Sequence, residues 1–331
     1  MNEAIAADGS AFKDRKTGLI VFGIFQILLG AFFALMLLLM IFGMVVSATV
    51  HKNSAHSMNA AAMIPALLFY VLLAVWFIWM GIGSLMVRRW ARALLLVASW
   101  FWFISGLMGL AFMLIFLPDM YGTLNSAQIP RTVATIIKWV TIGFMVIFYI
   151  IIPGAIILFY GSRHVKATCE QYDPQIRWTD RCPLPVLAVS LMAGCSTACM
   201  PFAGLYGWVV PFFGVILNGI AGAAILIPFA ALLGYVAWGM YRLRINAWRC
   251  ATGLVVFWGI SSTLTFTRVG LITLYEKMNF PAEQLEAMRK MALPQGHWIV
   301  LSTIVWIAIA LGYLFYIKRY FPATMDQKAA P

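Results

Sequence analysis

The chain has 331 residues, of which 63% are hydrophobic and only 10% are charged. Soluble globular proteins average roughly 45–50% apolar and about 25% charged residues, so this composition excludes a soluble fold. A mean hydropathy of +0.91 indicates that lipid is the solvent for most of the molecule. The sequence therefore describes a polytopic membrane protein.

Eight stretches are long and apolar enough to cross a hydrocarbon core about 30 Å thick, which takes roughly 20 residues of helix. They run near 18–43, 62–87, 91–116, 132–160, 184–209, 218–243, 247–272 and 297–318. All are continuously apolar instead of alternating with period two. This pattern predicts an all-α bundle of eight transmembrane helices.

The basic residues predict the orientation of these helices. The first seventeen residues are polar, and the apolar run after them is longer than the apolar region of a secretory signal peptide. We therefore expect the first helix to be a membrane pass that is not cleaved off. Of the 23 Lys and Arg residues, Lys138 and Arg268 lie inside helices and sixteen lie on the side of the termini. Only five lie on the opposite side: Lys52, Arg131, Lys277, Arg289 and Lys290. We therefore expect both termini in the cytoplasm and a location in the cytoplasmic (inner) membrane.

The formal net charge of +12 raises the question of a nucleic-acid partner. The cations, however, form short clusters at helix ends, with Trp90, Trp248 and Tyr320 nearby. That arrangement is typical of anchoring to anionic lipid headgroups. We expect membrane lipids as partners, together with a membrane protein partner or a second copy, and no nucleic acid.

The sequence also contains an apparent internal duplication. A shift of 156 residues pairs Gly83 with Gly239, Arg88 with Arg244, and the Phe-Trp pair at 101–102 with that at 257–258. A shift of 166 residues pairs 14–15 with 180–181. The change from one shift to the other is explained by two corresponding connectors of different length, the polar connector 44–61 and the shorter apolar connector 210–217. We predict a tandem 4+4 parallel repeat, 1–165 and 166–331, with no soluble domain and with both repeats in the same orientation.

No residue pattern predicts a catalytic centre, a cofactor or a metal site. All eleven acidic residues and all four histidines fall in tails, loops or at a helix edge. Ion-coupled transport usually depends on intramembrane carboxylates or broken helices, and haem needs axial ligands between helices. The sequence therefore gives little support to a pump or a haem protein.

Arg268 is the deepest charge of the seventh helix, about four residues from its outer end. A long basic side chain at this depth can extend to the outer headgroups, and we expect it to do so. The alternative is a binding role together with Thr265, because a guanidinium can hold an anionic group with two hydrogen bonds.

The fifth helix carries the small, slightly polar run Gly194–Cys199. Cys195 and Cys199, four residues apart, share a face and are expected to be buried and unreactive. Such runs usually let neighbouring helices approach closely. The alternatives are that Ser196 and its neighbours line a pore, or that the two thiols bind a metal or take part in redox chemistry.

Cys182 begins the run Cys-Pro-Leu-Pro immediately before an apolar helix. This run resembles the Cys-Pro-x-Pro helix start of small sulfur-carrier proteins, which implies a thiolate at Cys182 favoured by the helix N-terminus. Prolines are also common at helix starts for conformational reasons alone. Cys169 and Cys182 are expected on the cytoplasmic side, more accessible to charged thiol reagents than Cys195 and Cys199.

Residues 281–293 are expected to form a short amphipathic helix on the outer membrane surface, or else a lid over an outward cavity. Taken together, these patterns favour a non-enzymatic multi-pass protein that acts through helix packing with lipid or partner subunits. The alternative is a transporter or channel for a small or lipidic solute, with its path between the two repeats.

Overall fold

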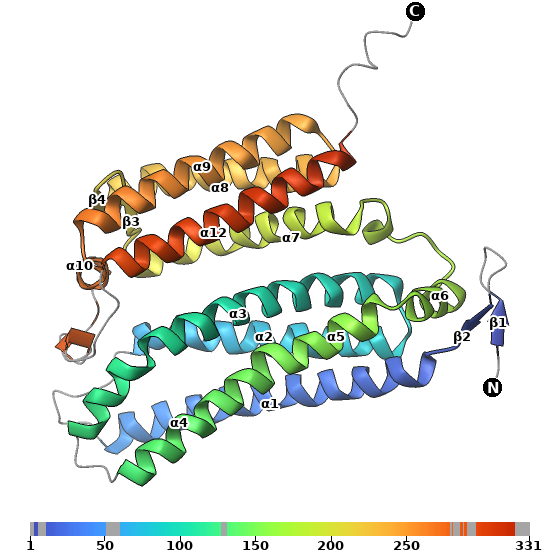
Figure 1. Ribbon diagram of the computed structural model, residues 1–331, viewed down its shortest axis with the longest axis horizontal. Helices are drawn as coiled ribbons and strands as arrows, with labels where there is room; N and C mark the ends of the chain where they lie inside the picture. Colours follow the sequence, from blue (N-terminus) through green and yellow to red (C-terminus); the bar gives the residue numbers. More distant parts are fainter. Residues whose placement is uncertain are drawn as a thin grey trace, which may run out of the picture. The chain divides into compact units, whose positions relative to one another are not determined.

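The computed structural model describes residues 3–5, 11–50, 60–126, 131–278, 280, 285–286, 288–289 and 296–321. Within them, two short β-hairpins accompany an otherwise helical chain (Figure 1). The main helices are α1 (Lys16–Val50), α2 (Ala60–Leu85), α3 (Arg89–Ser126), α4 (Arg131–Val146), α5 (Ile152–Gly161), α6 (Arg163–Tyr172), α7 (Leu184–Cys199), α8 (Gly219–Tyr241), α9 (Ile245–Arg268), α10 (Leu271–Lys277) and α12 (Gly296–Ile317). The remaining elements are β1 (Glu3–Ile5), β2 (Ala11–Lys13), β3 (Val210–Phe212), β4 (Val215–Leu217), the π-helical turn η1 (Ile147–Ile151) and the 3₁₀ turns η2 (Trp178–Asp180), η3 (Met200–Tyr206) and η4 (Lys318–Tyr320).

The eight predicted membrane passes are confirmed as long apolar helices. The spans are Lys16–Val46, Ala66–Leu85, Arg89–Ala111, Thr135–Gly161, Leu184–Tyr206, Gly219–Tyr241, Ile245–Arg268 and Gly296–Tyr320. Within the fourth span, η1 joins α4 to α5 and ends two positions before Pro153. Proline cannot donate the backbone hydrogen bond of a regular helix, which gives a local reason for the wider turn there. The protein is thus an all-α multi-pass integral membrane protein.

The chain forms two compact units. Unit 1 comprises Met1–Ile104 with Ile150–Arg181, and unit 2 comprises Ser105–Tyr149 with Cys182–Pro331. Helix α6 and the connector that follows it therefore belong with α1, α2 and α5, instead of opening the second half of the chain. The predicted repeat boundary at 165–166 stays a prediction, because compactness does not by itself define a repeat.

Unit 1 is held together by a close approach of α1 and α2. A Cβ on Gly23 would lie 2.9 Å from the Gly81 carbonyl oxygen, and a Cβ on Gly81 would lie 2.8 Å from the Gly23 carbonyl oxygen. Small residues at such crossings let two membrane helices pack backbone against backbone. Any side chain larger than hydrogen at either position would push the helices apart.

A fully buried chain of hydrogen bonds joins α1, α2 and α5 within unit 1. Ser84 Oγ donates to the Leu19 carbonyl oxygen (2.9 Å) and lies 2.6 Å from the Tyr160 hydroxyl. Gln26 Nε2 donates to the Tyr160 hydroxyl at 3.5 Å. Because the Ser84 hydrogen is used on Leu19, the Tyr160 hydroxyl donates to Ser84 and accepts from Gln26. The two hydroxyls and the Gln26 amide N–H are paired in this way, whereas Gln26 Oε1 is buried without a partner among the described residues.

Unit 2 is built on α7, α8, α9 and α12. Its core includes Val186, Leu187, Val236 and Met240, and the Trp248 indole N–H crosses from α9 to donate to the Leu314 carbonyl oxygen of α12 (2.7 Å). This bond removes the polar end of a buried indole from the apolar interior.

The corner between α2 and α3 and the corner between α8 and α9 have the same geometry. Val87 and Leu243 each adopt φ 53°. Arg88 N–H donates to the Gly83 carbonyl oxygen (2.9 Å), as Arg244 N–H does to that of Gly239 (2.8 Å). This is the Schellman helix end, in which glycine usually occupies the left-handed position. Both corners use a bulkier side chain there, and the two corners are 156 residues apart.

The connector 210–217 departs from the expectation of a plain apolar loop, because it forms the antiparallel hairpin β3–β4. Phe213 (φ 42°) and Gly214 (φ 95°) form its turn, with positive φ at both central positions as in a type I′ turn. The residues that favour strands here are a short run of Val, Ile and Phe, which in the sequence resembles a piece of membrane helix.

Of the amphipathic helix expected at 281–293, most residues lie outside those that the structure describes.

Candidate functional site

An elongated cavity of about 450 Å³ lies among α7, α8, α9 and α12, entirely within unit 2. It is lined by Val189, Met192, Ala193, Ser196, Phe229, Leu233, Val236, Ala251, Leu254, Val255, Trp258, Gly259, Ser262, Thr303, Trp306, Ile307, Ala310, Tyr313 and Leu314. None of these lining residues is charged. Along α12 the lining runs from Thr303 to Leu314, about 16 Å at 1.5 Å per residue.

Small side chains open this cavity and aromatic rings form its walls. Ala193, Ala251 and Ala310 leave space that larger side chains would fill. Phe229 of α8 stacks on Trp258 of α9, with ring centroids 4.8 Å apart and planes 18° apart. The result is a slot with rigid apolar walls, of a size and lining common in sites for apolar ligands between bundle helices.

Four of the lining residues carry a hydroxyl group: Ser196, Ser262, Thr303 and Tyr313. The Tyr313 hydroxyl donates to the Pro185 carbonyl oxygen (3.0 Å). Thr303 Oγ1 donates to the Ile299 carbonyl oxygen of its own helix (2.8 Å). Within the described part of the chain, the side-chain hydroxyls of Ser196 and Ser262 make no hydrogen bond. Their donors are therefore available to an acceptor in the cavity.

The structure places one of the predicted site residues, Ser196, in the cavity and the others elsewhere. Cys195 and Cys199 are exposed on the bundle surface and do not line the cavity. The expectation that these two thiols are buried is wrong: α7 turns them away from its helical neighbours. Their spacing does put them on one face, and that face is an outer one.

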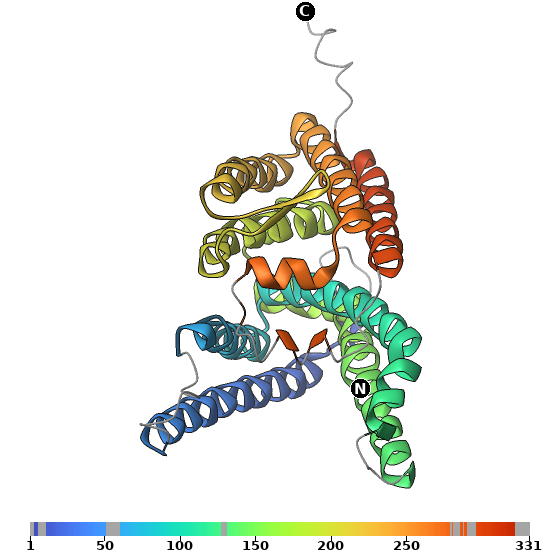
Figure 2. The same ribbon diagram turned by 90° about the vertical axis from the view of Figure 1, so that its left-hand side faces the viewer.

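Thr265 is fully buried and serves the hairpin instead of a ligand. Its Oγ1 accepts from the Gly214 N–H (3.0 Å) and donates to the Ser261 carbonyl oxygen (2.8 Å). Ser261 Oγ accepts from the Phe213 N–H (3.1 Å) and lies 3.3 Å from the Pro211 carbonyl oxygen, to which it donates. Figure 2 shows the yellow strands β3 and β4 running toward α9. Two hydroxyls of α9 thus satisfy the backbone of the hairpin turn, as non-helical backbone near a membrane requires.

Arg268 is exposed at the end of α9, and neither it nor Thr265 lines the cavity. A Cβ on Gly214 would lie 3.0 Å from Arg268 Nη1 and 3.1 Å from its Cδ, so the arginine lies across the hairpin turn. Within the described residues, Arg268 has no carboxylate partner. The extension of its charge to the outer headgroups stays a prediction.

Cys182 and Cys169, expected to be the accessible thiols, are both buried. Burial raises the pKa of the Cys182 thiol to about 11 and, as the largest effect, raises that of Cys169 to about 12. A nucleophilic cysteine needs the opposite shift. The Cys182 thiol lies 3.7 Å from the neighbouring Pro183 carbonyl oxygen, a weak local contact.

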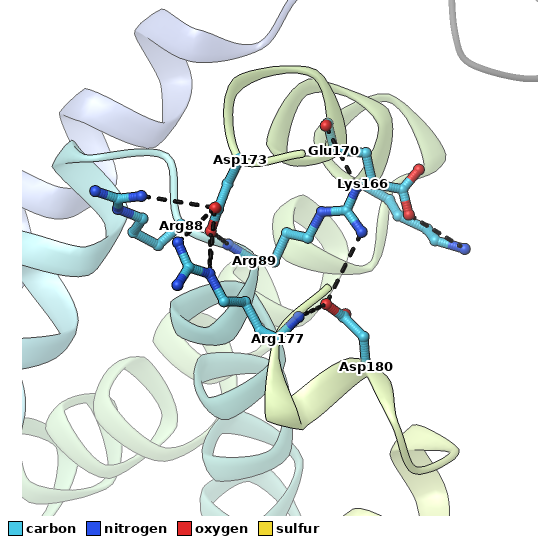
Figure 3. A network of polar contacts seen from close by, with 7 residues as sticks. All are labelled: Arg88, Arg89, Lys166, Glu170, Asp173, Arg177 and Asp180. Carbon is cyan, nitrogen blue, oxygen red and sulfur yellow. Dashed lines mark hydrogen bonds and ion pairs between the residues drawn. The ribbon is translucent and has the colours of Figure 1, made fainter. Parts of the chain in front are cut away.

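Sequence reasoning missed the ionic cluster centred on Asp173 in unit 1, which Figure 3 shows between Arg88 and Arg177. Arg177 donates to both carboxylate oxygens of Asp173 (2.7–3.2 Å), Arg88 lies 3.6 Å away, and the Arg89 N–H donates at 3.3 Å. Hydrogen bonds from Arg177 lower the pKa of Asp173, although its burial opposes this. The cluster joins the connector after α6 to the start of α3.

The signal for this cluster in the sequence was the acidic Asp173 followed four residues later by the basic Arg177, together with the Arg88–Arg89 pair.

Among the described residues no group of three His, Cys, Asp or Glu side chains could hold a metal ion. Neither a protein-family model, nor a curated protein sequence, nor a solved structure matches the chain. The cavity of unit 2 is therefore the feature from which a function can be argued.

Proposed function

We propose that the protein is a non-enzymatic protein of the cytoplasmic membrane that binds membrane lipid, with an apolar lipid chain lying in the cavity of unit 2. The observation that carries this proposal is the elongated, uncharged slot among four membrane-crossing helices. A slot along the helices matches a chain that lies along the membrane normal. Its rim residues Met192 and Trp306 are exposed, which offers lipid a lateral entry.

The hydroxyl groups of Ser196 and Ser262 fit this ligand class. A lipid ester supplies carbonyl oxygens, which accept hydrogen bonds and have no donor of their own. Two serine hydroxyl donors in a largely apolar lining would position such a group at low cost. Catalysis by either serine would require an adjacent general base, and the cavity lining contains no histidine, lysine or carboxylate.

The proposal includes the tandem arrangement 1–165 and 166–331 and the cytoplasmic location of both termini. The matching Schellman corners at Val87 and Leu243 support the duplication, because they recur at the same 156-residue shift as the sequence identities. The concentration of cations on the side of the termini supports the orientation.

Native mass spectrometry of the purified protein with dioleoylphosphatidylcholine tests the proposal. We expect the wild-type protein to retain at least one lipid under conditions that strip detergent. Ala310→Phe places a ring in the slot and should lower lipid occupancy at least about tenfold, a loss comparable to that of one well-buried apolar contact.

Ala224→Phe is the matched control, since Ala224 is exposed on α8 and does not line the cavity. It should retain wild-type occupancy. A folded Ala310→Phe protein with unchanged occupancy, or a wild-type protein that holds no lipid, would refute the proposal; a stoichiometric protein partner in place of lipid would favour action through subunit packing.

A further inference from the structure

Five exposed cations gather at the end of unit 2 where α8 ends, α9 begins and α12 ends (Figure 1). We refer to them as the basic end. They are Arg242, Arg244, Arg249, Lys318 and Arg319.

Within the described part of the chain, no cation of the basic end has a carboxylate partner. Unit 1 differs, because Asp173 and Asp180 pair with Arg88, Arg89 and Arg177. Arg88 and Arg244 are counterparts at the 156-residue shift, so equivalent corners carry a neutralised arginine in one unit and an unneutralised one in the other.

Aromatic rings hold three of these cations in place. The Arg242 guanidinium lies 4.7 Å from the Trp238 ring centroid, and the Lys318 ammonium lies 5.0 Å from that of Trp248. Arg319 lies 4.2 Å from the Tyr316 ring and donates to the Tyr316 and Tyr320 hydroxyls. Cation–π contacts position a cation without cancelling its charge. The basic end therefore keeps its attraction for anions.

The basic end adjoins the cavity. Leu314 lines the cavity, and its carbonyl oxygen accepts the hydrogen bond of Trp248, whose ring lies under Lys318. Lys318 follows Leu314 by four residues, about 6 Å along the helix. An apolar slot thus ends about one helical turn from an unneutralised ammonium group. An amphiphile with an anionic head has this same arrangement of chain and charge.

We infer that the lipid held by unit 2 is anionic, with its chain in the cavity and its phosphate against the basic end. This inference rests on the proposed function, since it assumes that the cavity holds a lipid chain. The guanidinium groups of Arg319 and Arg249 and the ammonium of Lys318 can donate to phosphate oxygens. A phosphatidylglycerol headgroup satisfies this chemistry, whereas the choline of phosphatidylcholine adds a cation where five already lie.

The test is competition between dioleoylphosphatidylglycerol and dioleoylphosphatidylcholine, measured by native mass spectrometry of the full chain. We expect the wild-type protein to prefer phosphatidylglycerol by about fivefold or more. The double variant Lys318→Gln/Arg319→Gln should lose most of this preference, because each cation near an anionic lipid surface contributes about fivefold in affinity. Both substituted residues are exposed, and a gel-filtration profile checks that the variant is folded.

Arg163→Gln supplies the matched control. Arg163 is the counterpart of Arg319, follows the same Phe-Tyr pair, and is exposed in unit 1. It should leave the preference unchanged. Equal affinity of the wild-type protein for the two lipids, or an equal loss in the control, would overturn the inference. Displacement of phosphatidylglycerol by glycerol phosphate alone would also overturn it, because the site would then bind a soluble anion.

The two proposals fail in different ways. If Ala310→Phe removes both lipids while Lys318→Gln/Arg319→Gln leaves their ratio unchanged, only the inference about the headgroup is wrong. If Ala310→Phe removes neither lipid, the cavity does not hold the chain and the proposed function is wrong.

Discussion

At the scale of single residues, burial and the partners met there decide the chemistry of several side chains that look ordinary in the sequence. In the sequence, Asp173 is one of several acidic residues in a loop. In the structure it is buried among arginines, and its pKa is lowered. Arg89 adds a buried Nε without a partner among the described residues. Ionic groups in such surroundings stabilise a fold only while their partners stay charged.

Asp173 should make the stability of unit 1 depend on pH. Its folded-state pKa lies below the ordinary value near 3.9, so its contribution is fully present above about pH 4 and is lost as the pH falls through the lowered folded-state pKa. Asp173→Asn should cost about 1–3 kcal/mol at neutral pH, and the difference from wild type should shrink in acid. Thermal unfolding in detergent between about pH 7 and pH 3 measures both effects.

Glu170→Gln is the control for this measurement. Its ion pair with Lys166 is long (3.9 Å) and solvent-exposed on both sides, so its loss should cost less than about 1 kcal/mol. A difference between Asp173→Asn and wild type that stayed constant from neutral to acidic pH would contradict the assigned role of the carboxylate.

Thiol reactivity should follow burial and not the loop positions of the cysteines. Cys169 and Cys182 have pKa values raised to about 12 and about 11, so almost no thiolate is present at neutral pH. A charged maleimide should label both slowly in the folded protein and rapidly after unfolding in dodecyl sulfate. Fast labelling of folded Cys182 would instead support the reactive thiol that its Cys-Pro-Leu-Pro context implies.

At the scale of elements, the hairpin β3–β4 depends on hydroxyl groups from a helix far along the chain. Ser261 and Thr265, one turn apart on α9, accept from the N–H groups of Phe213 and Gly214. A hairpin this short is marginal in isolation. The two residues of its turn adopt positive φ, which costs energy at Phe213 in particular. The hydrogen bonds to α9 supply the stabilisation that the isolated hairpin lacks.

Thr265→Val should destabilise unit 2 by about 1–3 kcal/mol, because the Gly214 N–H loses its acceptor while the shape of the side chain is kept. Thr252→Val provides the comparison, since among the described residues Thr252 Oγ1 bonds to nothing but the Trp248 carbonyl oxygen of its own helix, to which it donates. Its cost should be within about 0.5 kcal/mol. Melting temperatures of the two variants in the same detergent check this, and equal shifts would show that the hairpin does not depend on Thr265.

At the scale of the whole molecule, eight apolar spans separate a basic side from a less basic one. An even number of passes among the described residues would place both termini on the same side, and the excess of cations on that side is the basis of our prediction that it is the cytoplasm. The predicted topology therefore rests on two independent properties of the chain, hydropathy and charge.

Reporter fusions test this topology directly. Fusions at residues 55, 125 and 285 should report the outer side of the membrane, and fusions at 90, 170 and 245 the cytoplasm. The fusion at 285 follows seven passes and is the most sensitive to an error in their number. A cytoplasmic signal there would contradict the eight-helix topology.

The sequence alone determined the features that depend on local composition. A membrane pass is a run of apolar residues whose length times 1.5 Å spans the hydrocarbon core, so hydropathy located all eight spans and the class of protein. The glycines and arginines of the two corners were visible as pairs at one shift, and their matching left-handed turns follow from a short local motif.

Only the tertiary structure decided the features that depend on which helices meet. The cavity arises where alanines of α7, α9 and α12 converge, and Asp173 is buried because a connector folds back onto α3. Thr265 is engaged by a hairpin 51 residues earlier in the chain, and Cys195 and Cys199 face outward because α7 packs with its other side. Hydropathy is uniform around such helices, so the pattern of residues carries no signal for which face turns inward; packing of specific side chains makes that choice.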